Sequence, residues 1–228
     1  LIQPGLIDYL TRMVLVNAIY FKADWETAFD ETLTKKMTFY PDETTQVPCD
    51  FMFAERDFGF YEQENGLKAI EIPYSKGKMS MLVILPKDKN GIFGITKETG
   101  PDWYNMINTS LVKKKVKLWL PKFKTTSEFE LSEVLQQMGM KEAFSDNADF
   151  SGMTGKKDLK ISKVIHKAFV EVNESGTEAA AASAVVMRVK SMPANQPEFR
   201  ADHPFLFIIK ENTQNRILFI GNIFNPAK

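Results

Sequence analysis

One long stretch without a large apolar side chain, residues 174–184, interrupts a sequence otherwise rich in apolar runs. Alanine is the strongest helix former, so local propensity predicts a surface helix over residues 178–184. The stretch lacks the large apolar side chains that would anchor a helix to a core, and Pro193 and Pro197 enforce extended or turn structure after it. It therefore has no single preferred local structure, and such conflicts are typical of functional segments.

Read as a strand, the same stretch divides its side chains between two faces, because successive residues of a strand point to opposite sides of a sheet. One face is small and apolar, while the other begins with Glu178 and ends with Arg188 and Lys190. The segment could therefore lie in a sheet with one face buried, and its small side chains would let it slide between existing strands. The apolar face consists of Thr177, Ala179, Ala181, Ser183, Val185, Met187 and Val189.

Strand-sized apolar runs dominate the rest of the chain. A glycine-containing loop joins residues 67–74 to 79–85 and predicts a hairpin. A helix is predicted over residues 101–110, where Pro101 suits a first turn. A second is predicted over residues 127–144, with Ser127 and Glu130 as a capping box. We therefore expect an α+β fold built mainly from antiparallel strands. The other predicted strands cover residues 10–21, 37–53, 116–123, 158–172, 204–209 and 216–224.

Composition excludes several classes of function. Lysine plus arginine and aspartate plus glutamate both number 29, which gives no bulk charge for binding nucleic acid or an anionic membrane. The apolar runs are too short to span a bilayer. The sequence has no Gly-x-Ser-x-Gly motif and no Cys/His cluster with metal-ligand spacing, and the single Cys49 is expected to be a packed hydrophobe. We therefore expect neither an enzyme nor a cofactor or metal site.

Several motifs, in a fixed order, resemble those of the serpin family of protease inhibitors. Residues 199–209, Phe-Arg-Ala-Asp-His-Pro-Phe-Leu-Phe-Ile-Ile, look like the family's C-terminal signature. Residues 15–29, 120–123, 131–140 and 161–168 match further family motifs in the expected order. The resemblance covers essentially the whole chain as the C-terminal portion of a serpin, without the N-terminal helices and first strands. It implies a partial serpin fold, one domain over residues 1–228, and an exposed reactive-centre loop over about 174–198.

The resemblance also implies a bait bond and a mechanism. Family spacing places the bond attacked by the protease between Lys190 and Ser191, with Arg188 as the alternative reactive residue. A lysine there suits trypsin-like proteases, whose specificity pocket carries a carboxylate. The cleaved loop would then insert into the main sheet, and release of stored strain would trap the protease. The implied hinge consists of Glu174, Gly176, Thr177, Glu178, Ala179, Ala180, Ala181 and Ala182.

Other residues match structural positions of the family rather than catalytic ones. Asn17 and His166 resemble a hydrogen-bonded pair in the shutter region, where the strands of the main sheet open. Trp25 resembles the breach tryptophan, at the point where insertion begins. Glu174 and Lys122 match a salt-bridged pair at the top of the sheet, and this pair is expected to influence its opening.

The resemblance implies a covalent complex with a trypsin-like serine protease, formed by a monomer. An extracellular, secreted protein is expected, with an intracellular location as the alternative. The basic run at residues 113–117 is better interpreted as a solvated strand edge than as a glycosaminoglycan site. Two other functions remain as alternatives: a non-inhibitory serpin acting as carrier, chaperone or storage protein, and an inhibitor of cysteine proteases.

Overall fold

The computed structural model describes residues 7–9, 11–98, 100–177 and 196–227. The chain forms two compact units. Unit 1 consists of Leu1–Phe21 and Thr125–Val170, and unit 2 of Lys22–Lys124 and Glu171–Lys228. No helix in the described parts of the chain is long and apolar enough to cross a membrane.

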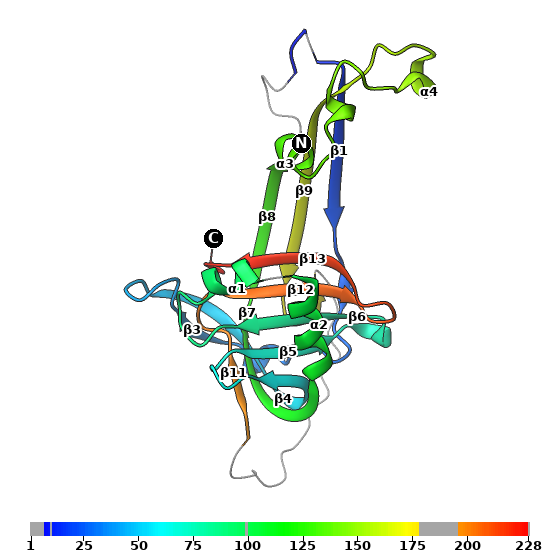
Figure 1. The fold of residues 1–228 in the computed structure, drawn as a ribbon. Coiled ribbons are helices and arrows are strands. Elements are labelled where there is room, and N and C mark those ends of the chain that lie inside the picture. Colours follow the sequence, from blue (N-terminus) through cyan, green and yellow to red (C-terminus); the bar gives the residue numbers. More distant parts are fainter. Residues whose placement is uncertain (1–6, 10, 99, 178–195, 228) are drawn as a thin grey trace. The chain divides into compact units, whose positions relative to one another are not determined.

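Unit 1 is built on long strands that lie side by side (Figure 1). Strand β1 (Met13–Tyr20) pairs in parallel with β9 (Ile161–Val172), and β8 (Phe123–Glu130) pairs with β9 as well. The first residues of β8 and the last of β9 belong to unit 2. Between β8 and β9 the chain forms short helices: α3 (Ser132–Gln137), η3 (Glu142–Phe144) and α4 (Ser151–Thr154).

The predicted helix over residues 127–144 is wrong in its first part. Ser127 and Glu130 lie in strand β8, and the helix begins only at Ser132. Glu130 precedes the helix by two residues. Its carboxylate still caps the first turn, because it accepts hydrogen bonds from the amide and the hydroxyl of Ser132. The backbone amide of Leu131 also donates to Val164 in β9. Sheet pairing thus takes precedence over the helical spacing of the apolar residues.

Unit 2 contains a mostly antiparallel sheet with the strand order β11-β7-β4-β5-β6-β12-β13, and β3 pairs with β4. The hairpin expected between residues 67–74 and 79–85 is present as β5–β6, and the strands expected at 204–209 and 216–224 pair with each other as β12–β13. The strands are β3 (Lys35–Phe39), β4 (Val47–Glu62), β5 (Lys68–Pro73), β6 (Met79–Leu85), β7 (Val112–Pro121), β11 (Glu198–Arg200), β12 (Phe205–Glu211) and β13 (Arg216–Ile223).

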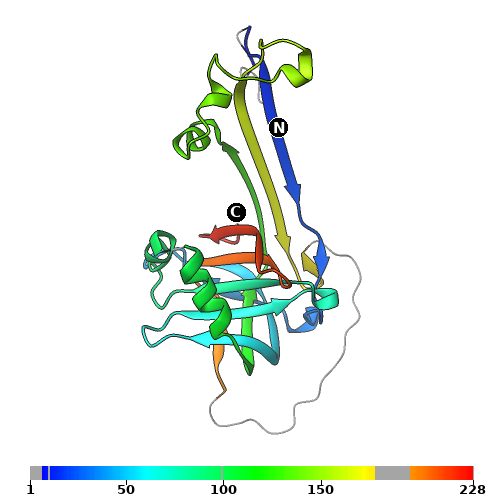
Figure 2. The same ribbon diagram turned by 45° about the vertical axis from the view of Figure 1, so that its right-hand side comes forward.

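Helix α2 (Pro101–Ser110) lies against one face of this sheet in both views (Figures 1 and 2). Its buried Tyr104 and Ile107 pack with Leu82 and Ile208 of the strands, so the helix closes one side of the core. Helix α1 (Ile92–Glu98), which the sequence did not predict, adds Ile92 and Ile95 to the same cluster. The short elements η1 (Glu31–Leu33) and η2 (Ser75–Gly77) lie in connections.

Two short strands complete unit 2 and carry the candidate site. Strand β10 (Gly176–Thr177) pairs antiparallel with β2 (Ala23–Asp24) on one side and with the end of β9 on the other. Residues 176–177 belong to the stretch 174–184, for which the sequence alone indicated no single preferred local structure. The start of that stretch is therefore already part of a sheet.

Candidate functional site

A tight turn connects β9 to β10. The amide of Asn173 donates to the carbonyl of Gly176 (2.9 Å), and the Asn173 side-chain oxygen accepts from the amides of Ser175 (3.1 Å) and Gly176 (3.2 Å). Asparagine favours such turns because its side chain can satisfy backbone amides two residues further on. The turn brings Thr177 opposite Val172, so that the chain reverses directly beside the strand it has left.

The opposite edge of this turn is bonded to the segment that follows β2. The amide of Trp25 donates to the carbonyl of Ser175 (3.0 Å), and the amide of Phe29 donates to the carbonyl of Glu174 (2.8 Å). Residues 174–177 are thus held by backbone hydrogen bonds from the segment after β2 as well as by the pairing with β9.

Gly176 is required by its surroundings. Its φ is +153°, and a Cβ added there would lie 2.2 Å from the carbonyl oxygen of Ala23 and 2.7 Å from the Cα of Asp24. Both obstacles are backbone atoms, which cannot move aside as a flexible side chain can. Only glycine therefore allows β2 and β10 to approach this closely.

Glu174 and Lys122 meet at this site, with the carboxylate Oε2 2.9 Å from the ammonium Nζ. The other carboxylate oxygen accepts a hydrogen bond from the Thr34 hydroxyl (2.8 Å). Burial alone would raise the pKa of Glu174, but hydrogen bonds from Lys122, from its own backbone amide and from Thr34, together with the Lys122 charge, hold the pKa below its ordinary value. Glu174 is therefore buried and ionised, while Lys122 remains partly exposed.

Thr177 is completely buried, and its hydroxyl lies 2.7 Å from the hydroxyl of Tyr74, which is also completely buried. The Tyr74 ring stacks on Trp25 with a centroid separation of 4.5 Å and an interplanar angle of 8°. The indole N–H of Trp25 donates to the carbonyl of Asn173 (2.9 Å). Burial raises the pKa of Tyr74, against a smaller lowering by the bond with Thr177, so the phenol stays protonated.

The structure thus brings together Glu174, Gly176, Thr177, Trp25 and Lys122, which the sequence singled out. Sequence reasoning missed two partners, Tyr74 and Thr34. Both lie far from residue 174 along the chain, and neither belongs to a pattern that marks it as functional. Tyr74 follows the apolar run of β5 and has the sequence signature of an ordinary core residue.

Asn17 and His166 lie in unit 1 and face each other in the parallel pairing of β1 with β9. Asn17 is exposed and His166 half-buried. Their role in strand opening stays a prediction. The other histidine, His203, is buried with Nδ1 2.8 Å from Asp202 Oδ1 and Nε2 2.9 Å from the Pro86 carbonyl. Both ring nitrogens of His203 thus have partners, and the contact with Pro86 joins two segments that are distant in the sequence.

The bait bond lies outside the described residues, as do several of the hinge positions. The chain is again described from Gln196, and β11 then pairs in parallel with Lys117, Leu118 and Trp119 of β7. Both flanks of residues 178–195 are therefore anchored in the strands of unit 2. The sequence-predicted residues outside the description are Lys190, Ser191, Arg188, Glu178, Ala179, Ala180, Ala181 and Ala182.

The basic run belongs to β7, which pairs with β4 along its length, whereas β11 covers only its later part. Lys115 lies 3.1 Å from a Glu55 carboxylate oxygen, and Lys117 lies 3.9 Å from Glu198. Interleaved carboxylates reduce the positive potential that a polyanion would need. A glycosaminoglycan site thus gains no support from this face.

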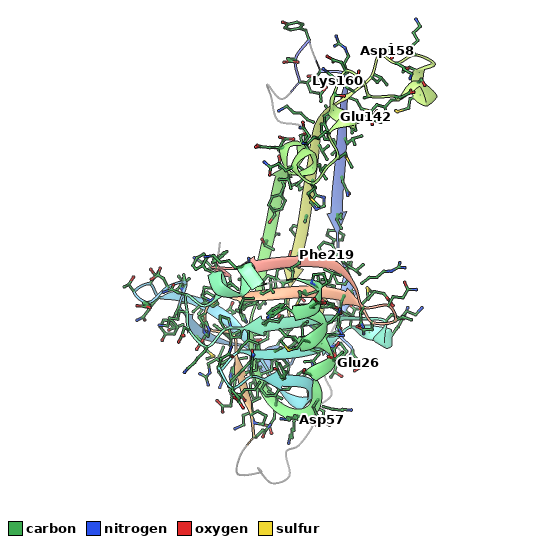
Figure 3. All side chains as sticks on the ribbon, in the orientation of Figure 1. Glu26, Asp57, Glu142, Asp158, Lys160 and Phe219 are labelled. Atoms are coloured by element: carbon green, nitrogen blue, oxygen red, sulfur yellow. The ribbon has the colours of Figure 1, made fainter. Side chains whose placement is uncertain are left out.

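Charged side chains also gather at one end of unit 1, where Glu142, Asp158 and Lys160 project (Figure 3). The Lys160 ammonium lies 2.6 Å from Asp146, and Lys157 lies 2.9 Å from Asp149. These are exposed pairs of the kind that contribute little to stability. Nowhere in the described part of the chain do three or more His, Cys, Asp or Glu residues form a group that could hold a metal ion.

Comparison with known proteins extends these observations. The family model "Serpin (serine protease inhibitor)" matches residues 1–226. Serpin B8 of Homo sapiens is 42% identical across 99% of this chain, and Iripin-3 of Ixodes ricinus is 40% identical across 95%. The chain spans 61% and 56% of the lengths of these two relatives. Human thyroxine-binding globulin has a similar structure, with a TM-score of 0.87 and 33% identity over 97% of this chain and 58% of that one.

Proposed function

The chain belongs to the serpin family, and from that membership we propose that it supplies the bait loop, the hinge and part of the receiving sheet of a suicide inhibitor of trypsin-like serine proteases. The family description supports inhibition of serine proteases in general. The activity of the whole protein, the preference for trypsin-like enzymes and the exact bait bond belong to the proposal. So does the assignment of residues 1–228 to a single domain.

The docking of Thr177 between β2 and β9 carries this proposal. A loop that is to become a strand needs a place in the sheet and side chains small enough to enter it. Thr177 of the hinge already occupies such a place, buried and hydrogen-bonded. The alternating small residues that follow in the sequence suit continued strand formation.

The proposed reaction begins at the bait bond. The serine oxygen of the protease bonds to the carbonyl carbon of Lys190, the peptide bond to Ser191 breaks, and Ser191 leaves with a free amino group. The freed loop, now attached to the protease through an ester, inserts from Thr177 onward as a new strand. Insertion drags the protease along and distorts its active site, so that the protease can no longer catalyse hydrolysis of the ester, and strain released in the sheet drives the movement.

Lys190 supports a trypsin-like target because a buried carboxylate in the protease pocket would pair with its ammonium. Arg188 would enter the same protease pocket if the protease attacked the bond two residues earlier in the sequence. An extracellular location and a monomeric state remain predictions, with an intracellular location as the alternative. A preference for cysteine proteases is a further alternative, and the same covalent assay distinguishes it.

One observation favours a second candidate function, that of a carrier. Unit 2 has a mainly apolar pocket of about 390 Å³ between α2 and strands β12 and β13. Tyr104, one of the lining residues, has a buried hydroxyl that lacks a hydrogen-bond partner among the described residues. Pockets of this size and character bind small molecules, and the structurally similar thyroxine-binding globulin is named for a small ligand. The pocket is lined by Gly100, Pro101, Tyr104, Asn105, Ile208, Asn215 and Ile217.

Incubation of the protein that contains this chain with a trypsin-like protease tests the main proposal. We expect a complex that survives denaturing electrophoresis and contains both proteins in equal number, with a new N-terminus at Ser191. Cleavage after Lys190 without any such complex would contradict inhibition and favour the carrier. A complex formed only with a cysteine protease would contradict the proposed target class.

A further inference from the structure

A hydrogen bond of 2.7 Å joins the hydroxyls of Tyr74 and Thr177. Both residues have zero exposed surface, so water cannot replace either partner. Within the described part of the chain, Tyr74 supplies the one side-chain hydrogen bond to the Thr177 hydroxyl. If the tyrosine hydroxyl were removed, docked Thr177 would carry an unsatisfied buried hydroxyl, which disfavours the docked state.

Tyr74 is held firmly enough to act as a fixed support. Its ring stacks on Trp25 at 4.5 Å, and an isolated β-bridge joins the two backbones. Phe29 packs edge-on against Trp25 at 6.0 Å, and the Arg56 guanidinium lies 5.2 Å from the Phe29 ring. This aromatic column fixes the position of the tyrosine hydroxyl before any loop residue arrives, so the ring needs no rearrangement to meet Thr177.

We propose that Tyr74 is a positioning residue whose hydroxyl keeps Thr177 docked between β2 and β9 before cleavage, so that insertion starts from a strand residue already in place. This inference rests on the proposed inhibitory function. The same bond persists while the loop inserts, because Thr177 stays in the position it already holds. Tyr74 therefore determines the starting point of insertion rather than restraining the loop.

This starting point matters because insertion competes with hydrolysis of the ester to the protease. When Thr177 is docked, each further residue that joins the sheet forms its hydrogen bonds beside a residue that is already paired. When the hinge is undocked, Gly176 and Thr177 must first become ordered together, which costs conformational entropy. A delay at this step gives water more time to release the protease. The number of inhibitor molecules consumed for each protease molecule trapped therefore measures how well Thr177 is docked.

Tyr74→Phe removes the hydroxyl and retains the ring that stacks on Trp25. We expect it to raise the ratio of hydrolysed to trapped esters by about fivefold, the effect of losing a hydrogen bond of typical strength, and the consumption of inhibitor per trapped protease should rise with that ratio. The rate of attack at the bait bond should not change, because the substitution removes a hydrogen-bond partner of Thr177 and leaves the residues at the bond as they are. Tyr61→Phe is the matched control. Among the described residues, the one hydrogen bond of the Tyr61 hydroxyl is a long exposed contact with Met106 (3.8 Å), and its loss should leave the consumption unchanged.

Thr177→Val tests the same bond from the other side while preserving the shape of the side chain. If the bond is the cause, the double variant should resemble the more affected single variant, because both changes remove one interaction. Fully additive effects in the double variant would overturn the inference.

Amide hydrogen exchange in the uncleaved protein supplies a measurement that does not depend on inhibition. Tyr74→Phe should accelerate exchange in residues 172–177 while exchange in β5 and β6 keeps its rate. Unchanged exchange at the hinge would overturn the positioning role even if the wild-type protein traps proteases.

Faster hinge exchange together with a wild-type protein that forms no complex would support docking by Tyr74 and contradict the proposed function instead. Faster exchange throughout unit 2 with unchanged inhibitor consumption would show that Tyr74 only stabilises the fold, and would also overturn the inference.

Discussion

The carboxylate of Glu174 lies 2.9 Å from the ammonium of Lys122, and Glu174 lies within the turn that docks Thr177 in the sheet. The first hinge residue named by the sequence is therefore fixed by charge as well as by backbone pairing. Because Glu174 is buried and Lys122 partly exposed, the strength of this pair lies between that of a surface pair and that of a fully buried one.

Glu174→Gln should lower the free energy of unfolding at neutral pH by about 1–2 kcal/mol. The pKa of Glu174 is below its ordinary value of 4.5 in the folded protein, so the contribution of the carboxylate is fully present above pH 4.5. It declines as the pH falls from 4.5 through the lower folded pKa. Denaturant unfolding of wild type and variant should therefore give a difference that is largest near pH 7 and smallest near pH 3. A difference independent of pH would contradict the ionised pair.

Thr177→Arg should convert the inhibitor into a substrate. The side chain at this position is completely buried, and an unpaired guanidinium there would cost several kcal/mol, about enough to exclude the residue from the sheet. Denaturing electrophoresis should show cleaved protein and no covalent complex. Thr177→Ser is the control, because it retains the hydroxyl that meets Tyr74 and should still trap the protease.

Gly176→Ala should destabilise the docked hinge by roughly 1–3 kcal/mol, because its Cβ would lie 2.2 Å from the Ala23 carbonyl oxygen in a backbone conformation with φ of +153°. Faster amide exchange of residues 173–177 would report the loss. Gly94→Ala in helix α1 is the matched control, since a Cβ there meets no atom within 4 Å and alanine favours a helix. Equal exchange in both variants would contradict the close approach of β2 and β10.

Lys190→Ala should reduce the rate of complex formation with a trypsin-like protease by at least about 100-fold, because the carboxylate in the specificity pocket would lose its partner. Arg188→Ala should have a much smaller effect. Mass spectrometry of the cleaved loop identifies the bond directly. A larger effect of Arg188→Ala than of Lys190→Ala, together with cleavage after Arg188, would show that the bait bond lies two residues earlier than proposed.

Local sequence patterns predicted most strands of unit 2, because each apolar run there is bounded by turn residues. They failed at Ser127–Glu130, where helical spacing of apolar residues competed with pairing to β9. They also missed helix α1, whose two buried isoleucines are too few to mark a helical face. Both failures concern short segments whose structure is decided by the neighbours they pack against.

The sequence by itself determined that residues 174–184 are free of large side chains, that glycine stands at 176, and that a lysine follows at 190. These are properties of residues and of their spacing, and the hinge and the bait bond were predicted from them only together with the resemblance to serpins. Only the tertiary structure decided what holds the hinge: Thr177 meets a tyrosine 103 residues earlier, and Glu174 meets Thr34 as well as Lys122. The reason is physical, since the order and pairing of strands bring such distant residues within hydrogen-bonding distance, and no local pattern encodes that distance.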